Sequence, residues 1–398
     1  GMPGATWRTA CRTSLASPLR RPTHRTPKVH PTTGLPLSRA KGQHIIHNVG
    51  VVHKMLEAAN IQPADAVYEV GCGTGELTMQ LLPYARQVHT IDIEQRMVQE
   101  MTLRAESAGF SNFEAKVGDA LKSPMPRRFD VCVSNLPYQI SSPFIFQLLR
   151  RISVGPVWRS AVLMLQREFA ERLLADPGER LFSRLALNVR LFARVVRLFD
   201  VKPGSFIPQP QVHSTVVRIE PRVPAPDVDF NEWDAFVRLI FSRKSKTFRA
   251  QFKKISTLSM LEQNYKVRCS LTGEKPSRCP FPELVMSVLT DEGALHERGY
   301  GMDLDDLHSL LRAFNRRGIH FASVQGLRGR DGLLLPMPTE DQLRRAGLNP
   351  HSLLSPGSGG MRAGGLAVQR AVGGPVGAPL IPPPPRPPAM LPAPGLSY

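Results

Sequence analysis

Cysteine is scarce in this chain, and the spacing of the few cysteines excludes a common kind of metal site. The 398 residues include five cysteines, and none forms a CxxC pair, so a zinc knuckle of that type is excluded. We expect no metal. The odd number, with Cys72 and Cys132 in apolar segments, indicates a reducing compartment.

Long hydrophobic runs are also missing. No uninterrupted apolar stretch reaches the roughly 18 residues that a membrane-spanning helix needs, so we expect a soluble protein without a membrane partner. Hydrophobic residues nevertheless make up 42% of the chain, which suffices for one sizeable core and a second, smaller domain.

Acidic residues are missing from the beginning of the chain. The first one is Glu57, whereas the preceding segment contains nine basic residues: Arg8, Arg12, Arg20, Arg21, Arg25, Lys28, Arg39, Lys41 and Lys54. This segment therefore carries half of the formal net charge of +18. An enzyme for small neutral substrates does not need such a surplus. A polyanionic partner, either a nucleic acid or an anionic membrane surface, explains it.

The two ends of the chain differ in composition from the middle. Residues 1–40 are rich in Arg, Pro, Thr and Ser without hydrophobic periodicity, which predicts a disordered basic arm. A mitochondrial targeting peptide is the alternative, since it is also Arg-rich and acid-poor. Such a peptide usually forms an amphipathic helix, which four prolines in this segment would break: Pro18, Pro22, Pro27 and Pro31. Residues 324–398 are dominated by Gly, Pro, Leu and Arg and predict a disordered tail.

Residues 41–221 alternate short apolar runs with amphipathic stretches. This pattern predicts a Rossmann-like α/β fold whose mostly parallel sheet carries helices on both faces. The expected strands are 66–70, 87–91, 112–117, 129–134, 161–166, 195–201 and 215–220, the last one antiparallel. One expected helix begins at Glu76, and two others cover residues 95–108 and 167–175. After a Pro-rich linker, residues 222–323 predict a small helical RNA-binding domain with basic stretches such as 243–246.

A glycine-rich loop follows the first strand and precedes a helix. Gly71, Gly73 and Gly75 allow a tight turn and the close approach of a ligand to the main chain. Asp92 lies 21 residues after Gly71, at the end of the next strand, where a carboxylate accepts both hydroxyls of a ribose. Asp119 ends the third strand, where a carboxylate accepts an adenine amino group. These positions all lie at carboxyl ends of strands, where open α/β sheets bind ligands.

The loop by itself is ambiguous, because a glycine turn can bind another nucleotide or no ligand. Its G-x-G-x-G spacing differs from the dinucleotide pattern G-x-G-x-x-G, and the Lys and Ser/Thr of a Walker A loop are absent. With Asp92 and Asp119 at matching strand ends, S-adenosyl-L-methionine is the favoured cofactor.

The fourth strand leads directly into Asn135-Leu136-Pro137-Tyr138. This stretch resembles the motif of methyltransferases that act on amino groups, and we predict it to be the reaction site. An adenine amine is a poor nucleophile because its lone pair is delocalised into the ring. Hydrogen bonds from the amine to the Asn135 side-chain oxygen and the Leu136 carbonyl would hold it near a methyl donor. Pro137 fixes the turn, and Tyr138 offers a flat face for a base. The alternative, an ordinary strand-ending turn, is less favoured behind such a glycine loop.

Several motifs together resemble the ribosomal RNA adenine dimethyltransferase family, especially its eukaryotic and archaeal branch. The resemblance covers about residues 41–323 and implies that residues 41–221 form a methyltransferase domain dependent on S-adenosyl-L-methionine. It rests on residues 42–46, 71–75, 117–120, 135–143, 166–170, 206–210 with Val212 and Ser214, 217–221, 302–307 and 318–321. Two positions depart from the family pattern. Cys72 stands where Pro is usual, and Asp92 stands where Glu is usual, so we expect a different loop stiffness and a longer ribose contact.

The resemblance implies a reaction and a set of site residues. S-adenosyl-L-methionine would donate two methyl groups to each of two adjacent adenosines near the 3′ end of small-subunit ribosomal RNA. The implied cofactor contacts come from His44, Ile46, Gly71, Asp92, Asp119 and Asn135. Phe206 would face the target base opposite Tyr138, and the alternative is a core aromatic beside a Pro-rich turn.

The same resemblance predicts a monomer that acts on a pre-ribosomal particle in the nucleolus during ribosome biogenesis. Two alternatives stay open. One is a ribosome-assembly or RNA-binding factor whose catalysis is secondary. The other is the related mitochondrial branch of rRNA methyltransferases and transcription factors, for which the acid-free first 40 residues provide the reason.

Overall fold

The computed structural model describes residues 28–29, 34, 36–37, 43–154, 158–243 and 245–322. The predicted tail and most of the predicted basic arm lie outside these residues. Within the arm, β1 (Lys28–Val29) pairs antiparallel with β2 (Pro36–Leu37). Leu37 is buried in a small apolar cluster with Ile45 and Met97. For the rest of the arm, the expected disorder stays a prediction.

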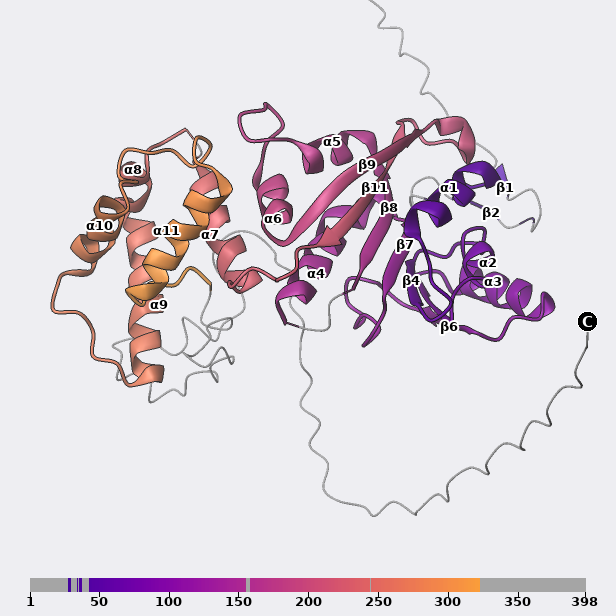
Figure 1. The fold of residues 1–398 in the computed structure, drawn as a ribbon, viewed down its shortest axis with the longest axis horizontal. Coiled ribbons are helices and arrows are strands. Elements are labelled where there is room, and N and C mark those ends of the chain that lie inside the picture. The colour runs from indigo at the N-terminus through magenta and orange to yellow at the C-terminus, as the bar shows by residue number, and fades with distance from the viewer. Residues whose placement is uncertain are drawn as a thin grey trace, which may run out of the picture. The chain divides into compact units, whose positions relative to one another are not determined.

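A seven-stranded sheet forms the centre of the chain that follows (Figure 1). Its strand order is β6-β5-β4-β7-β8-β11-β9; the strands from β6 to β8 are parallel, and β11 pairs antiparallel with β8 and β9. The predicted mostly parallel sheet with an antiparallel last strand is confirmed. The strands are β4 (Ala66–Val70), β5 (Gln87–Asp92), β6 (Phe113–Val117), β7 (Val131–Asn135), β8 (Ser160–Gln166), β9 (Ala193–Val201) and β11 (Ser214–Pro221).

Hydrophobic cores lie on both faces of the sheet, because successive side chains of a strand point to opposite sides. Val131 and Val133 of β7 belong to one core, and Cys132 between them belongs to the other. The first core is closed by α1 (Val49–Ala59), α2 (Thr78–Leu81) and α3 (Gln95–Ser107). The second is closed by α4 (Ser141–Val154), α5 (Arg167–Leu174) and α6 (Arg184–Phe192).

The chain after the sheet is helical up to residue 316, and its core is aromatic. Phe252 stacks on Phe314 with ring centroids 5.2 Å apart, and Phe321 meets both rings edge-on. Phe230 packs against Phe192 of α6 with centroids 5.3 Å apart, so the hydrophobic packing continues from the sheet layer into the helices. The helices are α7 (Phe230–Ser242), α8 (Phe248–Phe252), α9 (Ile255–Thr272), α10 (Phe281–Asp291) and α11 (Leu304–Arg316).

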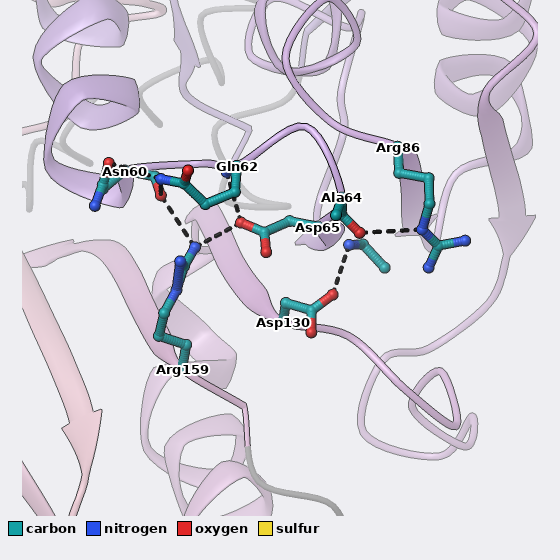
Figure 2. A network of polar contacts seen from close by, with 8 residues as sticks. Asn60, Gln62, Ala64, Asp65, Arg86, Asp130 and Arg159 are labelled. Carbon is teal, nitrogen blue, oxygen red and sulfur yellow. Dashed lines mark hydrogen bonds and ion pairs between the residues drawn. The ribbon is translucent and has the colours of Figure 1, made fainter.

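Polar contacts tie together the amino ends of three neighbouring strands (Figure 2). Asp65, Asp130 and Arg159 directly precede β4, β7 and β8. Asp130 Oδ2 accepts a hydrogen bond from Ala66 N at 2.8 Å. Arg159 Nη2 donates to Asp65 Oδ2 at 2.5 Å and to Asn60 O at 3.0 Å. The network holds the strands in register, and so fixes where their opposite ends present the loops of the candidate site.

Candidate active site at the carboxyl ends of the strands

A pocket opens at the carboxyl ends of β4, β5 and β7. The space inside it, open solvent included, amounts to about 870 Å³. The predicted residues that line it are His44, Ile46, Gly71, Gly73, Asp92, Asn135, Leu136, Pro137 and Tyr138. Three predicted residues, Gly75, Asp119 and Phe206, lie outside the lining.

The three glycines of the loop have different tasks, although all adopt positive φ angles. A Cβ on Gly71 would lie 3.1 Å from Pro137 Cγ, so this glycine lets the loop pack directly on the Asn135–Tyr138 motif. Gly73 N donates to the Asp92 carboxylate at 3.0 Å. A Cβ on Gly75 would lie 2.9 Å from Met101 Cγ. Gly75 thus serves the packing of the loop on α3 rather than the pocket.

Asp92 uses both of its carboxylate oxygens to shape the loops around it. Oδ2 accepts from Gly73 N at 3.0 Å, and Oδ1 accepts from Glu94 N at 2.9 Å. Burial raises the pKa of Asp92, and the two backbone N–H groups partly oppose that shift. Each carboxylate oxygen has a further lone pair, so these bonds are compatible with the predicted ribose contact.

Glu69 is a lining residue to which the sequence analysis assigns no role. It is the fourth residue of β4 and is 1% exposed, and its Oε2 accepts from the Thr78 hydroxyl at 2.6 Å. Burial, with a smaller contribution from the nearby Asp92 charge, raises the pKa of Glu69 to about 7. A carboxyl group inside an otherwise apolar strand is the signal that points to it.

Asn135 is oriented by the segment before α1. Its Nδ2 donates to His44 O at 2.9 Å, which fixes the amide plane and turns Oδ1 away from that carbonyl. His44 is held in turn, because its Nδ1 donates to Pro208 O at 2.7 Å. The short strands β3 (Ile45–Ile46) and β10 (Phe206–Ile207) pair antiparallel beside these contacts. Residues far apart in the sequence thus set the direction of the Asn135 side chain.

Tyr138 is held on its ring and at its hydroxyl. The ring stacks on His44 with centroids 5.8 Å apart and an interplanar angle of 29°. The hydroxyl and Ser214 Oγ are hydrogen-bonded at 2.7 Å. Burial raises the pKa of Tyr138, so the hydroxyl is protonated at neutral pH. Sequence reasoning gave no role to Ser214, which is fully buried in β11.

Phe206 requires a correction. It is 1% exposed and packs with Ile46, Val201 and Val216 in the core below the pocket. The expectation that it faces a target base is therefore not met, and the alternative of a core aromatic is what the structure shows. Its pairing with Ile46 explains the burial, because β10 pairs antiparallel with β3, the segment that borders the pocket.

Asp119 closes the turn after β6. Its Oδ1 accepts from Leu121 N at 2.9 Å, and its Oδ2 lies 3.6 Å from Lys122 Nζ. Its contact with an adenine amino group stays a prediction.

Half of the pocket lining was not predicted from the sequence: Gln43, Ile45, Glu69, Cys72, Glu76, Leu77, Ile93, Glu94 and Met97. Most of these residues directly neighbour predicted ones along the chain. In the part of the chain that the structure describes, no group of three or more His, Cys, Asp or Glu side chains is arranged to hold a metal ion. The same part contains no helix that is long and apolar enough to cross a membrane.

A family model described as ribosomal RNA adenine dimethylase matches residues 37–273. The chain belongs to this family. A probable dimethyladenosine transferase of Drosophila melanogaster is 44% identical to this chain over 291 residues, which cover 72% of the chain and 94% of the relative. A ribosomal RNA small subunit methyltransferase of Arabidopsis thaliana is 39% identical over 342 residues, covering 75% and 96%.

A solved structure supports the fold of this chain. The crystal structure of a dimethyladenosine transferase from Plasmodium falciparum superposes with a TM-score of 0.65 at 45% sequence identity. The superposition covers 70% of this chain and all of the other. The resemblance to the family and the Rossmann-like fold expected from the sequence are therefore confirmed.

As a member of this family, the chain methylates adenine in ribosomal RNA and takes S-adenosyl-L-methionine as its cofactor. The pocket suits this cofactor, because it combines the buried carboxyl group of Glu69 and the half-buried one of Asp92 with the glycine-rich loop. When bound, the cofactor supplies a methyl group on a positively charged sulfonium. A carboxylate in the pocket attracts that charge, and the Asn135–Tyr138 motif borders the same space.

Proposed function

We propose that this dimethylase adds two methyl groups to each of two adjacent adenosines near the 3′ end of small-subunit ribosomal RNA. The observation that carries the proposal is the fixed orientation of Asn135 beside the cofactor pocket. The name of the Arabidopsis relative, a ribosomal RNA small subunit methyltransferase, supports the choice of RNA.

The site residues act mainly by positioning the amine. Asn135 Oδ1 accepts one N–H of the exocyclic amine, and the Leu136 carbonyl accepts the other. These hydrogen bonds draw the nitrogen lone pair out of the ring and direct it toward the cofactor. Such alignment supplies up to about 7–11 kcal/mol of the barrier reduction. The base must leave its stack to enter, and Tyr138 provides the surface on which it is received. The proton leaves to solvent after transfer, so no strong general base is needed.

The test is to incubate the full-length protein with labelled S-adenosyl-L-methionine and small-subunit particles, and then to map the methylated nucleotides. We expect label on two neighbouring adenosines in the 3′ region, as N6,N6-dimethyladenosine. Asn135→Ala should abolish transfer, because it removes the side-chain oxygen that accepts the amine. Label on a different nucleotide, or on protein, would overturn the proposal.

We further propose that the substrate is a pre-ribosomal particle in the nucleolus, and that the protein acts there as a monomer. The net charge of +18 supports a large RNA partner. Imaging of a tagged full-length chain checks the location, and a mitochondrial signal would favour the mitochondrial branch instead. Light scattering of the purified protein checks the monomer.

Asn135→Ala also separates catalysis from docking. If ribosome maturation fails only when the whole protein is removed, and proceeds with the Asn135→Ala variant, docking is the principal role. If maturation fails with both, methylation itself is required.

A further inference from the structure

One connection in the sheet differs from its neighbours. The chain passes from β4 to β5, from β5 to β6 and from β7 to β8 through a helix, whereas residues 118–130, between β6 and β7, contain none. On the face that carries α3, Val88 and Ala115 are packed in the core. The opposite face of β5 and β6 lacks a covering helix and is bordered by the 118–130 segment instead.

A groove with about 820 Å³ of empty space results on that face. Its floor follows from the strand register. Tyr68, His89 and Glu114 lie side by side across β4, β5 and β6, and Ile91 and Lys116 lie side by side in the next row. We call this hollow, with the wall residues 124 and 126–128, the β5–β6 groove.

The charges of the β5–β6 groove are mostly positive. Lys116, Arg127 and Arg128 are exposed along it. The one acidic residue in its lining, Glu114, accepts a hydrogen bond from His89 Nδ1 at 3.0 Å and so has a local partner. The groove therefore presents three cations to solvent with one acid already engaged.

The groove is separate from the cofactor pocket but uses the same strands. Tyr68 and Ile91 line the groove, whereas the next residues, Glu69 and Asp92, line the pocket. Neighbouring residues of β4 and β5 thus serve two separate sites, the groove on one face of the sheet and the pocket at the carboxyl ends of the strands. An occupant of the groove would leave the cofactor pocket and the Asn135 motif unobstructed.

We propose that the β5–β6 groove binds phosphate groups of the substrate ribosomal RNA, outside the segment that enters the active site. This inference rests on the proposed function, which supplies a polyanionic substrate. Phosphate is the matching partner because guanidinium groups bind it through paired N–H donors, and three cations over one groove can neutralise successive phosphates. An acidic protein surface is the competing occupant.

The experiment measures how salt weakens binding of small-subunit ribosomal RNA transcribed in vitro. The variant Lys116→Gln/Arg127→Gln/Arg128→Gln removes the three cations. A matched control, Arg172→Gln/Arg180→Gln/Arg194→Gln, removes three exposed arginines elsewhere. Each lost phosphate contact lowers the slope of log affinity against log salt by about 0.7–0.9. We expect the groove variant to lower the slope by about 2–3, with tenfold or greater loss of affinity at low salt, and the control to change it by less than one.

The outcomes distinguish this proposal from the proposed function. An unchanged slope in the groove variant, or equal changes in both variants, overturns the groove as an RNA site. An unchanged slope combined with lost binding to intact particles assigns the groove to an acidic protein instead, and also overturns it. Methylation of small-subunit particles by the wild-type protein is measured in parallel. The absence of this methylation would overturn the proposed function, whatever the slopes of log affinity against log salt are. We expect the groove variant to keep the wild-type kcat when the substrate is saturating.

Discussion

Tyr138 is held in place before any base arrives, by His44 at its ring and by Ser214 at its hydroxyl. Stacking of a base on an aromatic ring contributes about 1–3 kcal/mol. Tyr138→Ala should therefore weaken RNA capture by about 5- to 150-fold, while cofactor affinity changes much less.

Tyr138→Phe is the matched control, because it keeps the ring and removes only the bond to Ser214. It should lose only a few-fold in capture. The measurement is the KM for RNA beside the Kd for cofactor from calorimetry. If Tyr138→Ala weakens both affinities equally, the stacking role is wrong.

Glu69 gives the cofactor site a pH dependence. Its pKa is about 7 in the folded protein against an ordinary value of 4.5, mainly because it is buried. A raised carboxyl pKa means that folding favours the protonated form. The resulting stabilisation is complete below about pH 4.5 and is lost as pH rises through 7. Cofactor affinity should instead increase as pH rises, because the ionised Glu69 carboxylate attracts the positively charged sulfonium of the cofactor. We expect roughly tenfold weaker binding at pH 6 than at pH 8.

Glu69→Gln tests both consequences at once. This variant should lose the decline in the free energy of unfolding between pH 4.5 and 7, measured by urea titration. Its cofactor affinity should vary less between pH 6 and 8, and any remaining variation reports titration of the cofactor itself. An unaltered pH profile of binding in the variant would contradict the assignment.

At the scale of elements, the glycine loop and α3 are fitted to each other at Gly75. Its φ of 90° is strained for any other residue, and a Cβ there would lie 2.9 Å from Met101 Cγ. Gly75→Ala should lower the free energy of unfolding by about 2–5 kcal/mol, from backbone strain and overpacking together.

Gly109→Ala isolates the two causes. Gly109 has a similar φ of 81°, but nothing lies within 4 Å of its Cβ position. This variant should therefore show only the backbone strain, about 1–2 kcal/mol. Chemical denaturation of both variants provides the comparison, and equal losses would mean that packing against Met101 contributes nothing.

Elements with a strong local pattern were predictable, and elements that depend on distant residues were not. The strand ending at Asp92 and the helix starting at Gln95 agree with the sequence to within a residue. The helix expected from Glu76 begins only at Thr78, because the preceding residues are still part of the loop. The two-residue strands β3 and β10 show no periodicity at all, and they exist because each pairs with the other.

The candidate site divides in the same way. Asn135 and Gly71 stand in local motifs whose residue types already indicate their chemistry. By contrast, Phe206 lies in a motif of equal clarity and yet is buried, because its environment is decided by Ile46 and not by its neighbours in sequence. Ser214 and Glu69 act through contacts that no local pattern contains.

At the scale of the whole molecule, the sheet and the helices that follow it should unfold together. One hydrophobic cluster contains both Trp158, beside the sheet, and Trp233 of α7. The next residue of α7, the buried Asp234, accepts hydrogen bonds from Asn188 Nδ2 of α6 at 2.6 Å and from Arg238 Nη2 at 2.6 Å. Asp234→Ala leaves Asn188 buried without this partner and should cost about 1–3 kcal/mol.

The chain has three tryptophans, so fluorescence of the variants Trp7→Phe/Trp158→Phe and Trp7→Phe/Trp233→Phe reports on the two regions separately. We expect coincident urea transitions in the otherwise wild-type chain, since coincidence of different probes is the sign of two-state unfolding. Adding Asp234→Ala should shift both midpoints downward. Separate transitions without the Asp234 change would show that the helices unfold as an independent unit.

The hydrogen bond between His44 and Pro208 joins residues that are 164 positions apart. Long-range contacts of this kind form late, because the loop between them must be closed first. During synthesis, the glycine loop and the Asn135 motif leave the ribosome well before the segment that holds His44 in place. The newborn chain can therefore complete its cofactor site only after Pro208 has emerged, and a nascent chain that ends before this residue lacks the contact that holds His44.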